Sequence, residues 1–173
     1  MSKAFTKDDA WEEPVVAARA PLPPGVPNYV TPRGLALLRG ELAALEESAR
    51  LLDVARSDED EQRRQRAVIG QRLGELAERI ASAQLVDPAR QAHDTVRFGA
   101  TVTLRDASDA WPGDARRLQI VGVDEADPAA GRVAFTAPIA RAVLGCAVGD
   151  VATLETADGE QQLEIVAIDY ATD

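Results

Sequence analysis

The apolar residues between positions 35 and 83 follow a heptad rhythm that is the same when read from either end. From both ends, hydrophobic side chains recur at alternating three- and four-residue steps, with few apolar residues outside this stripe. Such a narrow stripe is typical of a coiled-coil seam. If the segment folds back on itself, Leu38 faces Ile80 and Leu42 faces Leu76. The pattern therefore predicts an antiparallel two-helix hairpin that supplies its own partner helix.

The ends of the two helices are marked by local signals. Thr31 offers a capping hydroxyl and is followed by a proline at the first helical position, where the missing N–H costs nothing. We expect the first helix to extend from Pro32 to about Arg56 and the return helix from about Glu61 to Gln84, with a turn at 57–60. Each arm is then about 35–40 Å long. Arg66 falls opposite Leu52 in the seam, which predicts a weakened last turn near the tip.

From Val96 onward, apolar residues recur every two residues instead of every three and a half. Five segments of alternating polarity predict β-strands separated by turns, and Pro138–Leu144 predicts one short helix that begins with a proline and ends before Gly145. The five predicted strands are Phe98–Leu104, Arg117–Val121, Arg132–Phe135, Val151–Leu154 and Gln162–Ile168. The expected fold class is α+β: an N-terminal antiparallel coiled-coil hairpin followed by an antiparallel sheet domain with one short helix.

These patterns divide the chain into four parts. The first is rich in prolines and acids, lacks apolar periodicity, and is predicted to be a flexible leader in which the aromatic Phe5 and Trp11 are the only bulky anchors. The predicted parts are the leader 1–28, the hairpin 29–87, a polar linker 88–95 and the sheet domain 96–173.

Composition narrows the classes of function. The 173-residue chain has 29 acids against 19 lysines and arginines, a formal charge of -10, which argues against a general grip on nucleic-acid backbones. The single cysteine, Cys146, excludes an internal disulfide and a multi-thiolate metal site. Because the chain has no long apolar run and no apolar signal core at its start, we expect a cytoplasmic protein without membrane contact.

Several motifs, in order, match a known family. The matching stretches are Tyr29–Leu35, Ile80–Asp87, Phe98–Leu104, Ile120–Asp127, Ala137–Gly145, Val148–Asp150 and Glu164–Tyr170. In these motifs, which extend over roughly residues 29–171, the chain resembles the GreA/GreB transcript cleavage factors of bacterial RNA polymerase.

The resemblance implies an FKBP-like C-terminal domain that docks on the rim of the polymerase secondary channel while the coiled coil reaches inward. Acids at the tip then help to hold a second Mg²⁺ at the polymerase active site, where backtracked RNA is hydrolysed. The catalyst would be the polymerase, so the resemblance implies a non-enzyme with no catalytic residue and no stably bound cofactor of its own, only Mg²⁺ shared with its partner.

The resemblance also assigns candidate residues. The metal-assisting tip would be Asp58, Glu59, Asp60 and Glu61, and the residues contacting RNA or the channel would be Arg56, Arg63, Arg64 and Arg66. The polymerase docking residues would be Thr136, Ala137, Pro138, Ile139 and Arg141. Hard carboxylate oxygens suit Mg²⁺, which takes one or two protein carboxylates and keeps several waters.

The tip departs from the family. The family's Gly-Asp-Leu-(Ser/Lys)-Glu-Asn-Ala-Glu-Tyr-like signature is absent, and the hairpin is shorter by about a dozen residues, which is about 10 Å less reach. The acids are then compatible with metal delivery, with an electrostatic role in the channel without cleavage, or with a solvated turn. The arginines are equally compatible with ion pairs to neighbouring acids at helical spacing. In the docking segment, Ala137 stands where relatives usually have Ser, and Ile139 also suits ordinary core packing.

Alternative functions follow from the same features. The leading hypothesis is a monomeric elongation factor that binds RNA polymerase and stimulates RNA cleavage, meeting nascent RNA only inside that complex; its rival is a channel-binding regulator without cleavage. A distant alternative is an FKBP-like prolyl isomerase, for which only Phe98, Trp111, Phe135 and Tyr170 are available as aromatic lining. A dimeric coiled-coil scaffold is disfavoured, because the hairpin pairs with itself.

The remaining polar candidates are expected to have structural roles and no catalytic or metal-binding role. His93 is expected to be exposed in the linker and Cys146 to be half-buried, neither with a catalytic partner. Asp124, Glu125 and Asp127 are expected to solvate a turn at the edge of the sheet.

Overall fold

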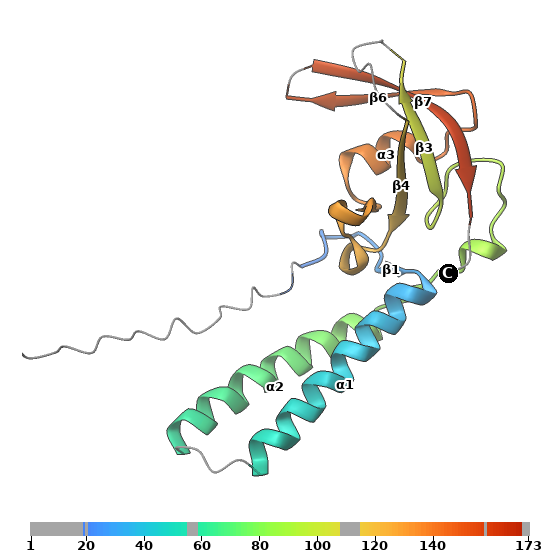
Figure 1. The fold of residues 1–173 in the computed structure, drawn as a ribbon. Coiled ribbons are helices and arrows are strands. Elements are labelled where there is room, and N and C mark those ends of the chain that lie inside the picture. The colour runs from blue at the N-terminus through green and yellow to red at the C-terminus, as the bar shows by residue number, and fades with distance from the viewer. Residues whose placement is uncertain (1–18, 20, 55–58, 108–114, 158, 171–173) are drawn as a thin grey trace, which may run out of the picture.

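The protein consists of a long helical hairpin and a curled sheet domain, here called the body, joined at the base of the hairpin (Figure 1). The computed structural model describes residues 19, 21–54, 59–107, 115–157 and 159–170. The anchors Phe5 and Trp11, as well as Trp111, lie outside these residues. No helix in the described part of the chain is both long and apolar enough to cross a membrane.

The hairpin has the antiparallel pairing that the heptad rhythm predicts. Helix α1 (Pro32–Val54) packs along helix α2 (Glu59–Ala81), with Leu38 and Leu76 each only 2% exposed in the seam. Around these two, the partly buried seam residues are Leu35, Leu42, Leu45, Ile80 and Ala83. Residues 55–58, which include the first half of the predicted turn, lie outside the described ranges. The other half is helical, because α2 begins at Glu59, two residues earlier than predicted.

A short parallel ladder closes the base of the hairpin. Strand β1 (Tyr29–Val30) lies beside strand β2 (Gln84–Leu85), so the chain enters and leaves the hairpin side by side. The buried Asn28 side chain donates to the Arg79 carbonyl at 2.7 Å and to Ser82 Oγ at 3.1 Å. The expectation of a flexible leader thus fails at its C-terminal end, because Asn28 is part of the packed base. Strand β2 also explains why α2 ends before Gln84.

The body contains all five predicted strands in one sheet, in the order β5-β4-β3-β7-β6. The strands are β3 (Thr101–Asp106), β4 (Arg116–Val121), β5 (Arg132–Ala134), β6 (Val151–Thr156) and β7 (Gly159–Asp169). The prediction of a purely antiparallel sheet is wrong at one edge, where β5 runs parallel to β4. Two 3₁₀ turns, η2 (Val123–Glu125) and η3 (Pro128–Ala130), carry the chain back between them, which is why a short connection gives a parallel pair.

One short helix covers the sheet. Helix α3 (Pro138–Val143) begins with a proline and is followed by Gly145 in the left-handed conformation at φ 87°, as the sequence predicts. Its Ala140 and Val143 are fully buried against the sheet. The linker forms the 3₁₀ turn η1 (Pro88–Arg90), capped by Asp87, whose side chain accepts from Ala89 N.

Candidate functional site

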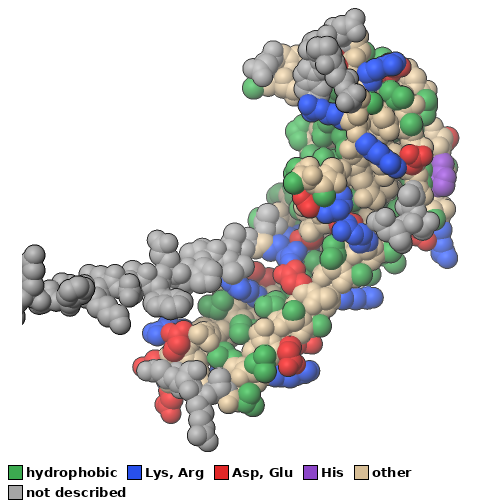
Figure 2. All heavy atoms as spheres, in the orientation of Figure 1, with side chains coloured by type: hydrophobic (Ala, Val, Ile, Leu, Met, Phe, Trp, Pro, Cys, Tyr) green, Lys and Arg blue, Asp and Glu red, His purple; other side chains and the backbone are tan. Residues whose placement is uncertain are grey.

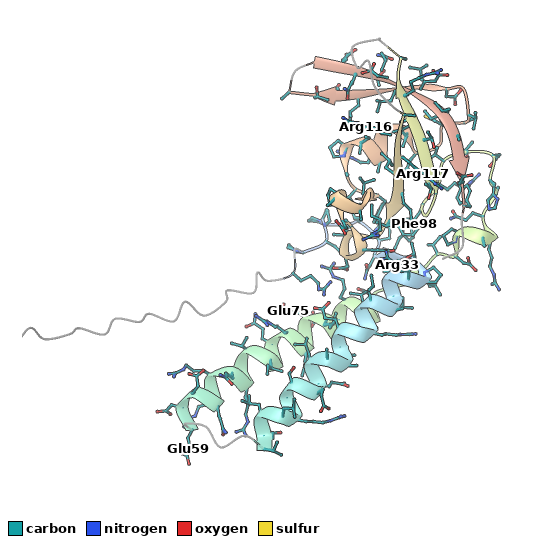
Figure 3. All side chains as sticks on the ribbon, viewed as in Figure 1. Arg33, Glu59, Glu75, Phe98, Arg116 and Arg117 are labelled. Atoms are coloured by element: carbon teal, nitrogen blue, oxygen red, sulfur yellow. The ribbon has the colours of Figure 1, made fainter. Side chains whose placement is uncertain are left out.

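The described tip acids form the first turn of α2, at the end of the hairpin farthest from the sheet. Glu59 marks this end in Figure 3, and Asp60 and Glu61 follow it directly. Carboxylates in a first turn are stabilised by the N-terminal end of the helix dipole, so this acidic run favours the helix instead of breaking it. Asp58 and Arg56 lie outside the described residues.

Two of the candidate arginines pair with these acids. Arg63 lies 3.3 Å from Asp60, and Arg64 lies 2.7 Å from Glu61, both at i,i+3 spacing. The interpretation of arginines neutralising neighbouring acids along the helix is confirmed for both. Such exposed pairs are worth a few tenths of a kcal/mol, so a stronger partner can displace them.

The heptad pattern places Arg66 in the seam opposite Leu52, where it is expected to weaken the last turn near the tip. Its Nε instead reaches across the hairpin to Asp53 Oδ1 at 2.9 Å, while Leu52 remains buried. Beneath this pair lies a cleft of about 220 Å³ between the two arms. It is lined by Ala49, Leu52, Asp53, Arg66, Ile69, Gly70 and Leu73. Because Ala49 has only a methyl group and Gly70 has no side chain, the seam is incompletely filled in this half of the hairpin.

The three described tip carboxylates lie on consecutive residues of one helical turn. Consecutive helical residues point about 100° apart, so the carboxylates of Glu59, Asp60 and Glu61 diverge instead of converging on one ion. Within the described ranges, no group of three or more His, Cys, Asp or Glu side chains is arranged to hold a metal. A site that takes one carboxylate from this tip and the rest from elsewhere fits the coordination habits of Mg²⁺. Among described residues, Glu59 makes no ion pair, which leaves it the most available of the three.

The predicted docking residues lie at the start of α3, in the body and remote from the tip (Figure 1). Pro138 and Arg141 are exposed, whereas Ala137 and Ile139 are half-buried and pack against the sheet core. Thr136, just before them, is also half-buried. The structure therefore offers Pro138 and Arg141 as the outward-facing members of this set, with the others supporting them.

A third cluster, which the sequence did not predict, lies where the hairpin meets the body. Figure 2 shows acidic and basic side chains close together at this junction. The prediction that Asp124 and Glu125 solvate a turn is wrong, because Glu125 is 5% exposed and the Asp124 side chain 8%. Both sit on η2 and face the base of the hairpin. Asp127 does behave as expected: it caps η3 and pairs with Arg132 at 2.8 Å.

Glu125 holds the start of α1. Its carboxylate accepts a hydrogen bond from Thr31 Oγ1 at 2.5 Å and another from Arg33 at 3.0 Å. Thr31 Oγ1 in turn accepts from Gly34 N at 2.9 Å, the capping bond that the sequence predicts. Figure 3 shows Arg33 at the hairpin base, beside the body.

Asp124 holds α2 and the end of the leader. Arg79 of α2 lies 3.3 Å from Asp124 Oδ2, and Arg19 lies 2.5 Å from Oδ1 and also pairs with Glu41 of α1. Burial alone lowers the pKa of the Arg19 guanidinium, but the hydrogen bonds to Glu41 and Asp124 outweigh it and leave that pKa above its ordinary value. Arg19 therefore stays fully charged at the junction.

Comparison with known proteins decides the family. Residues 91–170 match the family model described as "Transcription elongation factor, GreA/GreB, C-term". The chain is 34% identical over 155 residues to the transcription elongation factor GreA of Ralstonia nicotianae, covering 82% of this chain and 96% of the relative. The chain belongs to the GreA/GreB family.

Other relatives of this GreA/GreB protein extend the comparison. It is 33% identical over 158 residues to the transcription elongation factor GreB of Neisseria meningitidis serogroup B, covering 83% of this chain and 94% of that protein. Among solved structures, the GreA/GreB elongation factor of Nitrosomonas europaea is 22% identical at a TM-score of 0.40, covering 82% of this chain and 98% of that one.

The aromatic residues that the structure of this GreA/GreB protein describes form two separate groups. Phe98 packs against Tyr29 and Phe135, with ring centroids 5.7 Å from each, in a cluster between hairpin and sheet. Tyr170 stacks on His93 at 4.3 Å, and its hydroxyl donates to Thr95 O at 2.6 Å. The described aromatics of the prolyl-isomerase alternative are thus in two separate structural clusters.

His93 and Cys146 have the exposure that the sequence predicts. His93 is exposed in the linker apart from its stack, and Cys146 is half-buried behind α3. Burial, and then the negative charge of Asp150, raise the pKa of the Cys146 thiol above its ordinary value, so it stays protonated at neutral pH.

Only weak signals point to the junction cluster in the sequence. Thr31 is predicted as a cap, but its second role as donor to Glu125 depends on a residue 94 positions later. Arg79 precedes Ile80 of the seam, where a long charged side chain is ordinarily solvated. Nothing in the local pattern distinguishes Asp124 from the acids of any surface turn.

Proposed function

We propose that this GreA/GreB protein binds RNA polymerase and acts as a transcription elongation factor, with the body docked at the rim of the secondary channel and the hairpin directed inward. The observation that carries the proposal is the combination of family membership along most of the chain with a hairpin that holds its acids at the end away from the body (Figure 3). Relatives that match more than four fifths of this chain are named as transcription elongation factors.

The geometry gives each part a separate task. The 23-residue helices make an arm about 35 Å long, so a body held at an outer surface delivers the tip well inside a pore. Pro138 and Arg141 supply an exposed, partly cationic contact beside a rigid helix start. This two-part structure suits a factor whose body binds the polymerase and whose hairpin tip acts at a separate place.

We further propose that the tip lends a carboxylate to Mg²⁺ shared with the polymerase. When bound there, the ion supplies charge stabilisation and water activation for phosphodiester hydrolysis. Among the described residues, Glu59 is the best candidate for this metal-binding carboxylate, because it is exposed and makes no ion pair with another described residue. Asp60 and Glu61, held by Arg63 and Arg64, would orient the tip and keep its net charge moderate.

The decisive experiment adds the purified protein to a backtracked polymerase complex with labelled RNA. The proposal expects the RNA to shorten at least tenfold faster than without the factor, an effect of about 1.4 kcal/mol on the barrier. Glu59→Gln should remove most of this acceleration and leave polymerase binding intact, because an amide keeps the shape and loses the charge. Glu46→Gln, an exposed acid in the middle of α1, is the matched control.

One observation favours a second function, that of a channel-binding regulator without cleavage. Asp60 and Glu61 are already engaged by arginines, and the family's tip signature is absent. Under this reading the protein co-migrates with polymerase and changes pausing or initiation, while the RNA keeps its length. Failure to co-migrate with polymerase would overturn both readings.

A further inference from the structure

We propose that Asp124 and Glu125 are positioning residues that fix the direction of the hairpin relative to the body, each holding one arm. The functional part of this inference rests on the proposed function, since direction matters only if the body docks and the tip acts. The two acids are adjacent on one 3₁₀ turn, yet their partners belong to different helices. A hairpin held by both arms can neither tilt nor rotate about a single attachment.

The contact with α1 is built into the cap of that helix. Thr31 Oγ1 accepts from Gly34 N and donates to Glu125, so one hydroxyl both starts the helix and ties it to the body. Arg33 adds a charged bond to the same carboxylate. Because Thr31 and Glu125 are both buried, this contact is shielded from water and from salt.

The contact with α2 uses the only other carboxylate of the same turn. Arg79 is nearly buried, with 8% of its side chain exposed, and pairs with Asp124 two residues before the helix ends. Arg19 binds the other oxygen of Asp124 and bridges to Glu41 on α1. The end of the leader is thereby connected to the body and to the opposite arm.

The charged side chains of this cluster are paired. The ion pairs join three acids (Glu41, Asp124 and Glu125) to three arginines (Arg19, Arg33 and Arg79), so each of these acids has an opposite charge beside it. Paired groups in a partly dehydrated setting interact more strongly than surface pairs, and removing one leaves its partner uncompensated.

Two glycines show how closely the parts approach. A Cβ on Gly34 would lie 2.7 Å from Glu125 Oε2, and one on Gly122 would lie 2.6 Å from the carbonyl oxygen of Tyr29. Neither distance is compatible with an alanine unless something shifts. At Gly122 the backbone of the body therefore meets the hairpin base without room for a side chain, whereas at Gly34 the buried Glu125 carboxylate would have to move.

The consequence at the tip follows from the length of the arm. Over about 35 Å, a tilt of about 10° at the base moves the tip by about 6 Å. Assisting a metal ion requires placement to a fraction of an ångström, so even a small loosening of the joint would matter for function.

The test measures the joint directly, in the full-length protein. Spin labels are attached at Val54→Cys, at the end of α1, and at Val148→Cys on the body, with Cys146→Ser removing the native thiol; positions 54 and 148 are exposed. Double electron–electron resonance then gives the distance distribution between them. We expect one narrow peak in the parent, and a peak broadened or displaced by about 6 Å in Asp124→Asn, Glu125→Gln and Gly34→Ala.

Gly34→Ala is the sharpest variant, because it changes no charge and raises helix propensity while pushing Glu125 aside. Asp127→Asn is the matched control, since Asp127 pairs within the body three residues from Asp124. Circular dichroism confirms that each variant retains its helices. A distribution unchanged in both Gly34→Ala and Asp124→Asn would overturn the proposal, as would an equal change in Asp127→Asn.

Polymerase assays then separate the joint from the function. If both proposals hold, unlabelled Gly34→Ala binds polymerase within about twofold of the parent but loses most of its effect on the RNA, since docking is separate from reach. Equal loss of binding and effect would contradict a positioning role. Because the resonance measurement needs no polymerase, the joint can be confirmed while the proposed function fails, and the reverse.

Discussion

The base and the tip of the hairpin are made from the same two helices, yet they are packed in opposite ways. At the base, Leu38 and Leu76 are fully buried and a charged cluster is enclosed between hairpin and body. At the tip, Leu51 and Val54 are mostly exposed, a cleft opens in the seam, and the ion pairs face water. The base is packed against the body, whereas the tip is exposed to solvent.

The contrast shows where the free energy of this hairpin resides. A two-helix hairpin has only one seam, so it buries less per residue than a three-layered domain, and the body supplies the missing contacts only at the base. The tip half therefore depends on a partially filled seam and on exposed pairs worth little each. Changes to the base should be costly, and changes to the tip should be tolerated.

The largest effect is expected at the buried seam of the base. Leu76→Ala should lower the free energy of unfolding by about 3 kcal/mol, because it leaves a cavity in a tightly packed site. Leu51→Ala, whose side chain is 59% exposed, should cost less than about 0.5 kcal/mol. Urea denaturation of both variants measures the difference, and equal losses would mean that the two ends are packed alike.

A smaller loss is expected when the leader's attachment is removed. Arg19→Ala should lower the free energy of unfolding by about 1 kcal/mol, because the buried Asp124 loses its half-buried partner Arg19 and Glu41 loses an ion pair. Arg39→Ala, on the exposed face of α1, is the control and should change little. Thermal unfolding followed by circular dichroism provides the measurement. A neutral Arg19→Ala would show that the leader is dispensable to the joint.

Glycine-to-alanine changes should have opposite signs at the two ends. At Gly70 a Cβ meets nothing within 4 Å, so alanine should stabilise the hairpin by about 0.5–1 kcal/mol through helix propensity. At Gly34 the same change meets Glu125 and should destabilise. Denaturation midpoints of the two variants test this directly, and a shared sign would remove the distinction between a crowded base and an open tip.

The smallest effect is expected at the exposed pair across the tip. Arg66→Ala removes the bond to Asp53 and should cost at most about 0.5 kcal/mol, because both side chains are more than half exposed. Whatever it costs at low salt should shrink at about 0.5 M NaCl, where exposed charges are screened. Unfolding measured at both salt concentrations checks this. A loss as large as that of Leu76→Ala would show that the tip is held by its ion pair.

Much of the architecture could be predicted from local patterns. The seam pairs, the five strands, the short helix after Pro138 and the acid–arginine pairs of the tip all depend on residues close in sequence or on a repeating period. The parallel pairing of β5 with β4 could not be predicted, because strand direction depends on how η2 and η3 turn the chain. The position of Arg66 was also missed, since a long side chain can leave its heptad position and reach across the seam.

By itself, the sequence determined the parts: a self-pairing hairpin with an acidic end and a strand-rich body with the motifs of its family. Only the tertiary structure decided how these parts are joined. Asp124 and Glu125 look like any solvated acids along the chain, and they become a joint because docking of the body brings them to Arg79 and Thr31, 45 and 94 residues away. Periodicity reports which face of an element is buried, but ion pairs between separately folded elements leave no period in the sequence.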